Sequence, residues 1–183
     1  SSSPSKRPLR RSFSPPEKKA LELSVRADGS RDFIFRRDES NRLHFVGDFD
    51  GLYSSHDDPW NQSLRDEHMQ RYYSLSRTKI APLLGDFGIK YALEVGCGLG
   101  SSTHDIAKLS GANFVGMDIS ETAIQKATAR HPHLKFFHGD IMALDKEPIS
   151  TDSKFDGILL NQILWYVMHD LPSIFRNCKR MLK

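Results

Sequence analysis

The feature that most constrains the fold is a glycine-rich turn at residues 96–100, Gly-Cys-Gly-Leu-Gly, between two segments of different character. The five residues before it are mostly apolar, and residues 101–109 after it have a helical pattern that ends at Gly111. A strand that turns directly into a helix begins a βαβ unit. Glycines permit positive φ angles and the close approach of a ligand to the backbone. We therefore expect a parallel sheet with a ligand site at its carboxyl edge.

Strand and helix patterns alternate along the chain after Lys90. The expected strands are 91–95, 113–118, 134–138 and 155–160, and the expected helices are 101–109, 121–130 and 171–182. Ser120 is placed to cap the second of these helices. Short strands that alternate with helices of about ten residues are typical of parallel βαβ units. The expected fold class is therefore α/β: a Rossmann-like, doubly wound, mainly parallel sheet with helices on both faces.

Three further segments are expected before this core, which occupies 89–183. They are a disordered basic tail rich in Ser and Pro (1–25), a hairpin and loop extension (26–56) and a helical lid (57–88). The extension contains two short apolar-rich runs, 32–37 and 42–46, that predict a β-hairpin, followed by a loop at 47–51. The lid is expected to be one helix over 65–84, capped by Ser63 and stopped by Gly85 or Gly88.

Composition excludes several classes of protein. The net charge of +3 comes from a basic run, because residues 6–19 hold six lysines and arginines against one glutamate, so it does not indicate a nucleic-acid partner. No apolar run approaches the roughly 20 residues that span a bilayer, and no signal peptide is visible. Two distant cysteines predict neither a disulfide framework nor a zinc motif. These features favour a cytoplasmic protein in a reducing compartment.

Acidic residues at the strand ends indicate what the glycine turn binds. The turn reads Gly-x-Gly-x-Gly rather than the Gly-x-Gly-x-x-Gly of dinucleotide sites, and Glu94 precedes it. A pyrophosphate gains nothing from that acid, whereas a ligand with a cationic amino group does. Asp118 can accept both ribose hydroxyls, and Asp140 can accept an adenine amino group held between Ile119 and Ile141. S-adenosylmethionine (SAM), which has an ammonium, a sulfonium and no phosphate, matches this pattern.

Taken together, these segments resemble the class I SAM-dependent methyltransferases. Four segments correspond in order to the motifs of that family: 93–100, 115–120, 139–141 and 155–162. The resemblance covers about residues 60–183. It implies SAM as the cofactor, and the chain is expected to be C-terminally incomplete, because the ending Met-Leu-Lys usually continues into three further strands. The expected cofactor-binding residues are Trp60, Arg77, Glu94, Gly96, Cys97, Gly98, Gly100, Asp118, Ile119, Asp140, Ile141, Asn161 and Gln162.

Residues before the core resemble parts of particular methyltransferases. Arg77 lies at the spacing of an arginine that grips the SAM carboxylate in ubiquinone-biosynthesis O-methyltransferases, and an Arg fork suits a carboxylate. Asp58-Pro59-Trp60 with Tyr72-Tyr73 resembles the nodulation-factor N-methyltransferases. Residues 47–53 resemble methyltransferases of bacterial sugar and polysaccharide biosynthesis. These resemblances imply a sugar or amino-sugar acceptor, although Trp60 and Tyr72 also suit a purely packing role.

Several other chemistry-bearing residues are not assigned to the site. His131, His133 and His138 are not expected to converge, so no metal site is predicted. Cys97 is expected to be a small residue tolerated in the turn, since in-line methyl transfer needs no nucleophilic thiol. His169 and Tyr166 should lie on the rim where the acceptor arrives. There His169 has the chemistry of a general base for a hydroxyl or amine acceptor, and its alternative is a loop residue without a catalytic role. No catalytic residue is predicted, because alignment of the reactants alone accelerates such a reaction.

The sequence therefore leaves three functional hypotheses. The preferred one is a SAM-dependent methyltransferase acting on an oxygen or nitrogen of a small molecule, possibly a sugar. The second is a SAM-binding fragment or scaffold domain without catalysis, because later strands that usually shape the acceptor site are not expected. The third, an NAD-dependent oxidoreductase, is disfavoured by Glu94 and the glycine spacing. The acceptor, the choice between N- and O-methylation and the oligomeric state stay open.

Overall fold

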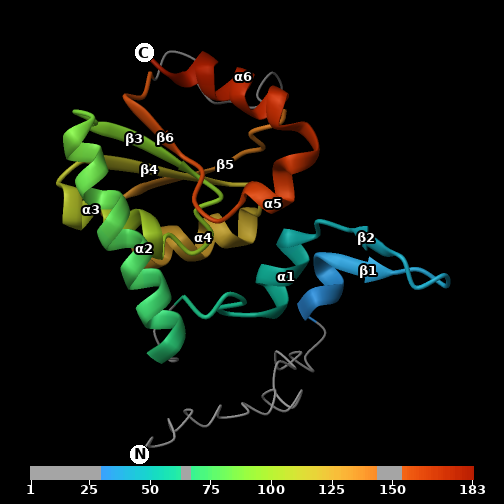
Figure 1. Ribbon diagram of the computed structural model, residues 1–183. Coiled ribbons are helices and arrows are strands. Elements are labelled where there is room, and N and C mark those ends of the chain that lie inside the picture. Colours follow the sequence, from blue (N-terminus) through green and yellow to red (C-terminus); the bar gives the residue numbers. More distant parts are fainter. Residues whose placement is uncertain (1–29, 63–66, 144–153) are drawn as a thin grey trace, which may run out of the picture.

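The computed structural model describes residues 30–62, 67–143 and 154–183, and its centre is a four-stranded parallel sheet (Figure 1). The strand order is β5-β4-β3-β6, so the first strand of the core, β3, lies in the middle. The bounds are Tyr91–Val95 for β3, Asn113–Asp118 for β4, Lys135–His138 for β5 and Gly157–Leu159 for β6. The expected α/β class and parallel sheet are confirmed. All four strands point the same way, so their carboxyl ends meet at one edge.

Helices cover both faces of this sheet. On one face, α2 (Glu67–Asp86) packs on α3 (Ser101–Ser110), and both contribute to an apolar cluster with Ala92 and Phe114 of the strands. The helix α4 (Glu121–Arg130) packs beside β4 and β5. Ser120 caps α4 as predicted, because its side chain accepts from the amide of Ala123.

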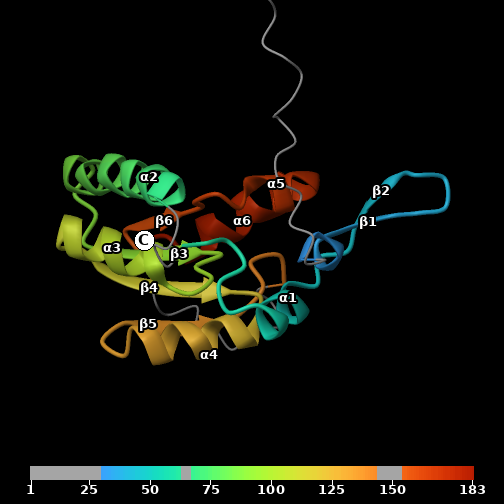
Figure 2. The same cartoon turned by 90° about the horizontal axis from the view of Figure 1, so that it is seen from below.

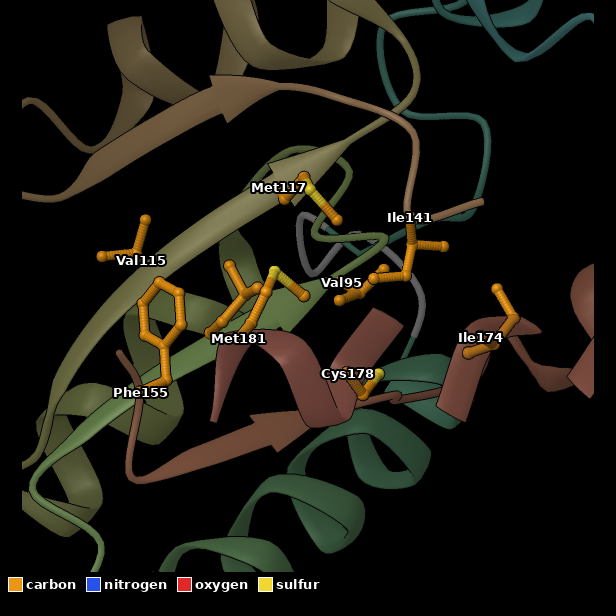
Figure 3. Packing of buried hydrophobic residues seen from close by; sticks show 9 residues of the cluster. Val95, Val115, Met117, Ile141, Phe155, Ile174, Cys178 and Met181 are labelled. Carbon is orange, nitrogen blue, oxygen red and sulfur yellow. The ribbon is translucent and has the colours of Figure 1, made fainter. Parts of the chain in front are cut away.

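The opposite face is covered by α6 (Leu171–Met181). Figure 3 shows its apolar side chains directed toward the sheet, where they form the main core. The buried members of this core are Leu93, Val95, Val115, Met117, Ile141, Phe155, Ile174, Cys178 and Met181. Successive strand residues point to opposite faces, so Leu93 and Val95 meet α6 while Ala92 and Glu94 face α3. Alternate residues of β3 therefore pack against α6 on one face and against α3 on the other.

A small N-terminal unit lies at the carboxyl end of the sheet (Figures 1 and 2). It consists of the 3₁₀ turn η1 (Ser30–Phe33), the antiparallel strands β1 (Phe35–Arg37) and β2 (Leu43–Phe45), and the helix α1 (Phe49–Ser55). The predicted hairpin is therefore confirmed. The predicted loop at 47–51 is wrong, because Asp48 accepts from the amide of Gly51 and starts α1 there.

Other differences from the predicted bounds are small. The lid helix runs to Asp86 rather than Leu84, and the predicted Ser63 cap lies outside the described residues. The tail predicted for 1–25 also lies outside them. The strand predicted at 155–160 comprises only Gly157–Leu159, and Phe155 forms a separate parallel bridge with Leu182 just after α6. A short helix α5 (Leu164–Val167) and the turn η3 (Met168–Asp170) follow it.

Candidate cofactor site

A cavity of about 530 Å³ opens at the carboxyl edge of the sheet. Its walls come from the ends of all four core strands, from α1 and β2, and from the segment around α5. This volume lies within the range of small-molecule sites. All but two of the predicted cofactor-binding residues line it; the exceptions are Arg77 and Gly100.

The glycine turn forms the floor of the cavity in a conformation that needs glycine. Gly96 and Gly98 have φ angles of +72° and +52°. A Cβ on Gly96 would stand 2.4 Å from a methyl of Ile163, and one on Gly98 would stand 2.5 Å from the hydroxyl of Tyr53. The backbone at Gly96 and Gly98 therefore lies so close to Ile163 and Tyr53 that a side chain would clash there.

Asp118 ties this turn to the end of β4. Its carboxylate accepts from the amide of Gly98 at 2.8 Å and from the amide of Ser120 at 2.9 Å. Burial raises the pKa of Asp118, and the two amide donors act against that shift. Each carboxylate oxygen of Asp118 keeps a further lone pair that can accept a hydrogen bond from a ligand in the cavity.

Glu94 is fully buried behind the turn. The hydroxyl of Thr103 donates to its Oε2 at 2.6 Å, and Ser102 beside it receives a hydrogen bond from Asn161. Burial raises the pKa of Glu94, while the hydroxyl donors and the charge of Arg77 lower it. The predicted acid at the strand end is thus held by the first turn of α3 and linked to the loop after β6.

The ends of β4 and β5 supply the remaining predicted residues. Asp140 accepts from the amide of Met142 at 2.8 Å, which fixes the turn after β5. Ile141 is part of the core, whereas Ile119 is largely exposed at the mouth of the cavity. Both isoleucines therefore border the cavity, Ile141 fixed by packing and Ile119 open to solvent. Gln162 has a φ of +62° and its carbonyl accepts from the indole of Trp165.

Tyr53 is a lining residue that sequence reasoning missed. It is buried on α1, and its hydroxyl accepts from the indole of Trp60 at 3.0 Å while lying beside Gly98. Burial raises the pKa of Tyr53, with the Asp118 charge adding to the shift. The Asp and Gly residues at 47–51 favour a loop locally, so the sequence pattern does not place the following Tyr53 on a helix. Trp60 therefore reaches the cavity together with a second aromatic side chain.

Tyr166, on α5, joins the N-terminal unit to the core. Its ring lies 5.2 Å from Phe49, 6.2 Å from Trp60 and 6.3 Å from Phe45, measured between ring centroids. All four rings line the cavity. The cover over the cavity thus comes mainly from residues 45–60, and α2 contributes Tyr72 and Tyr73 near its start.

The structure does not bring Arg77 and Gly100 into the cavity lining. Arg77 is buried between α2 and α3, where its guanidinium pairs with Asp105 and lies 5.4 Å from the ring centre of Tyr73. Gly100 caps α3 instead, and a Cβ there would stand 2.6 Å from the ring of Phe136. Asp105 lies 28 residues after Arg77. Spacing to the glycine turn did not reveal this partner.

The histidines predicted to stay apart do so only in part. His131 and His133 both contact His104, with ring centroids 4.7 and 5.1 Å away, whereas His138 bonds to the carbonyl of Ile119. Within residues 30–62, 67–143 and 154–183, no group of three potential ligands is arranged to hold a metal ion.

The cavity fits SAM better than a dinucleotide. Its carboxylates are Glu94, Asp118 and Asp140, and none of the described lining residues is a lysine or an arginine. A pyrophosphate would bring two negative charges toward these acids, whereas SAM brings an ammonium and a sulfonium. The turn also leaves backbone rather than side chains at the cavity floor. These hydrogen-bond acceptors therefore suit a cationic nucleoside.

Fold and site together define a class I SAM-dependent methyltransferase domain. The family described as "Methyltransferase domain" matches residues 92–183, which is half of the chain, and the chain belongs to this family. SAM is the cofactor of the family, as predicted. Within the part of the chain that the structure describes, no helix is both long and apolar enough to cross a membrane.

Curated relatives are larger enzymes. The chain is 30% identical over 110 residues to the sterol 24-C-methyltransferase ERG6B of Gibberella zeae, covering 55% of this chain and 28% of that protein. It is 31% identical over 97 residues to the sterol 24-C-methyltransferase erg6 of Aspergillus fumigatus, covering 50% of this chain and 24% of that protein. The match thus spans less than a third of these relatives.

Solved structures show the same fold. The N-methyltransferase NodS of Bradyrhizobium japonicum, in complex with S-adenosylhomocysteine, is 26% identical with a TM-score of 0.52, covering 70% of this chain and 63% of that one. The PH0226 protein of Pyrococcus horikoshii is 23% identical with a TM-score of 0.53, covering 74% and 62%. The likeness to PH0226 concerns the fold alone.

Proposed function

We propose that this chain binds SAM in the cavity at the sheet edge and transfers its methyl group to an oxygen or nitrogen of a small molecule. One observation carries the proposal: three carboxylates from three adjacent strand ends, those of Glu94, Asp118 and Asp140, surround a glycine turn with no described lysine or arginine in the lining. That arrangement suits the cationic methionine part and the neutral nucleoside part of SAM.

The proposed contacts follow from these positions. Asp118 holds the ribose hydroxyls with the lone pairs that Gly98 and Ser120 leave free. Asp140 accepts from the adenine amino group, with Ile119 and Ile141 on either side of the ring. Glu94, behind the turn, favours the ammonium through its charge. The side chains of Asn161 and Gln162 close the end of the site next to β6.

The reaction itself is a direct displacement. A lone pair of the acceptor forms a bond to the methyl carbon as the carbon–sulfur bond breaks, leaving S-adenosylhomocysteine, and the acceptor proton passes to water. The chain contributes alignment and exclusion of water, which supply a large part of such a barrier reduction. His169 lines the cavity, but no contact assigns it a proton-transfer role.

Isothermal titration with SAM tests the first step. Wild-type protein should bind, and Asp118→Ala should bind at least about tenfold more weakly, because it loses the ribose contact and the anchor of Gly98. Glu39→Ala, at the exposed hairpin turn, is the matched control and should bind like wild type. A folded wild-type sample that binds no SAM, or an Asp118→Ala variant that binds equally well, would contradict the proposal.

The narrower acceptor hypothesis is a sugar or amino sugar. It is supported by the resemblance of residues 47–53 to methyltransferases of bacterial sugar and polysaccharide biosynthesis, and by that of Asp58-Pro59-Trp60 with Tyr72-Tyr73 to the nodulation-factor N-methyltransferases. The curated relatives, in contrast, are named for sterols. Transfer of a radiolabelled methyl group to a panel of sugars, amines and sterols tests it. Mass spectrometry of the labelled product then distinguishes N- from O-methylation.

A second candidate function is SAM binding without catalysis. It is motivated by the short match, since the chain covers less than a third of its curated relatives. Tight SAM binding combined with no turnover of any acceptor in the panel would favour this candidate. Turnover of one acceptor would exclude it.

A further inference from the structure

The mouth of the cavity is unusually apolar for a surface that faces water. Five large apolar or aromatic side chains both line the cavity and remain exposed: Trp165 (70%), Tyr72 (52%), Phe45 (47%), Ile119 (47%) and Val46 (43%). Leu164 and Met168, on either side of Trp165 in the sequence, are also exposed. Contiguous exposed apolar surface of this kind marks a binding site in a soluble domain.

This apolar rim is continuous with the interior. Phe45 stacks on Tyr166, and Tyr166 in turn contacts Phe49 and Trp60 inside the cavity. The path from Trp165 at the surface to Tyr53 beside Gly98 is therefore lined by aromatic rings. The rings of the N-terminal unit and of the α5 segment contact each other, so they form one aromatic wall along this path.

The carboxylates of the described cavity lining come from the ends of the core strands and not from the N-terminal unit or the α5 segment. The lining carboxylates stand at the ends of β3, β4 and β5, and no lysine or arginine lies among the described lining residues. A phosphorylated acceptor, such as a sugar nucleotide, would find no cation to balance its charge. The acceptor side offers ring faces, amides and His169 instead.

We propose that the methyl acceptor is an amphipathic molecule with a large apolar body and no anionic group, which lies across the rim of Phe45, Val46 and Trp165 while its hydroxyl or amine enters past Tyr166. This inference rests on the methyl transfer proposed above, and it restricts a sugar acceptor to one that carries a large apolar group. The apolar body is only partly enclosed, because the rim residues are on the surface. Its burial against the rim supplies the binding free energy, and the aromatic path directs the reactive group toward the glycine turn.

The test compares two phenols that differ only in their apolar tail, p-cresol and 4-octylphenol, titrated into the full chain saturated with S-adenosylhomocysteine. We expect 4-octylphenol to bind about a hundredfold more tightly, since each buried methylene strengthens binding about fourfold and only part of the tail is enclosed. Trp165→Ala should weaken 4-octylphenol binding about tenfold while leaving p-cresol binding nearly unchanged. UDP-glucose should bind more weakly than 4-octylphenol.

Leu75→Ala is the matched control, because Leu75 is 60% exposed on α2 and does not line the cavity. It should not change binding of either phenol. Equal affinity for the two phenols, an equal loss for both in Trp165→Ala, or tighter binding of UDP-glucose would overturn the inference. A preceding SAM titration separates the two proposals: absence of SAM binding contradicts the methyl transfer, whereas SAM binding without a tail effect contradicts only the acceptor class.

Discussion

Asp50 of α1 and Ser120 of α4 are joined by a hydrogen bond of 2.9 Å between side chains 70 residues apart. The same Asp50 oxygen accepts from the amide of Thr122, so it caps the first turn of α4. These donors hold the pKa of Asp50 below its ordinary value. In return, Lys126 of α4 donates to the carbonyls of Tyr53 and His56 at the end of α1. The two helices therefore cap each other.

This mutual capping connects the cover of the cavity to its proposed cofactor side. Ser120 lies two residues after Asp118, and its amide donates to the Asp118 carboxylate. Tyr53, whose carbonyl receives Lys126, places its hydroxyl beside Gly98. A shift of α1 is thus transmitted both to the glycine turn and to the end of β4.

Asp50→Ala should loosen this contact. The loss of a capping carboxylate costs about 1 kcal/mol of unfolding free energy, measured by urea denaturation. We also expect SAM to bind a few-fold more weakly in isothermal titration, because Ser120 and Asp118 lose a constraint. Asp50→Asn keeps an oxygen acceptor and should lose less in both measurements. Identical behaviour of Asp50→Ala and wild type would show that α1 is held by its apolar contacts alone.

Gly98→Ala should be destabilised by two separable effects. A φ of +52° costs a residue with a Cβ about 1 kcal/mol or more, and the new methyl would stand 2.5 Å from the Tyr53 hydroxyl. In a Tyr53→Phe background the second effect should disappear, so the same substitution should cost less. Urea unfolding of the four proteins forms a double-mutant cycle. Strict additivity would mean that the hydroxyl is free to move aside.

The core could be predicted because its signals are local. The bounds 91–95, 113–118 and 121–130 were predicted as observed, since apolar runs, Ser120 and the glycines mark them within a few residues. The predicted acids Glu94, Asp118 and Asp140 meet in one cavity, because the carboxyl ends of parallel strands lie at the same edge of the sheet. The parallel direction of the strands is enough to predict this part of the site.

The missed parts depend on contacts between distant residues. The helix α1 begins in a segment rich in Asp and Gly, and its capping by Asp48 and docking through Asp50 to Thr122 reverse that local preference. Tyr53 therefore has no local sequence signal that indicates a place in the cavity lining. Arg77 has the spacing of a ligand residue, but its partner Asp105 is visible only once α2 packs on α3. Pairings at such separations leave no periodic pattern in a sequence.

The stability of the ligand-free protein should decrease as Glu94 and Asp118 ionise with rising pH. Burial raises both pKa values above the ordinary 4.5 and 3.8, so their protonated forms are favoured by folding. This contribution is fully present below the ordinary values and is lost as pH rises through the raised ones. The stability of wild type relative to Asp118→Asn should therefore fall with rising pH, measured by urea unfolding at several pH values. If the unfolding free energy of wild type instead increased relative to that of Asp118→Asn as pH rises, the raised pKa of Asp118 would be contradicted.

Ionisation of Glu94 and Asp118 should increase the affinity for SAM, whereas it decreases the stability of the ligand-free protein. Its ammonium and sulfonium interact favourably with ionised carboxylates, so its affinity should increase as pH rises through the raised pKa values. Isothermal titration of wild type over that range measures the slope. In Glu94→Gln and Asp118→Asn the slope should be smaller, because each removes one titrating group. A slope that both variants leave unchanged would assign it to other groups.

Arg77 and Asp105 allow the packing role and the predicted carboxylate-binding role of Arg77 to be separated. Asp105→Ala leaves the buried guanidinium without its carboxylate and should cost about 3 kcal/mol of unfolding free energy. Arg77→Met fills similar space without a charge and should cost less, since Asp105 is partly exposed and can be hydrated. Because Arg77 does not line the cavity, Arg77→Met should bind SAM within about twofold of wild type. A loss of about tenfold or more in Arg77→Met, with Asp105→Ala binding normally, would instead show that the guanidinium holds the carboxylate of SAM.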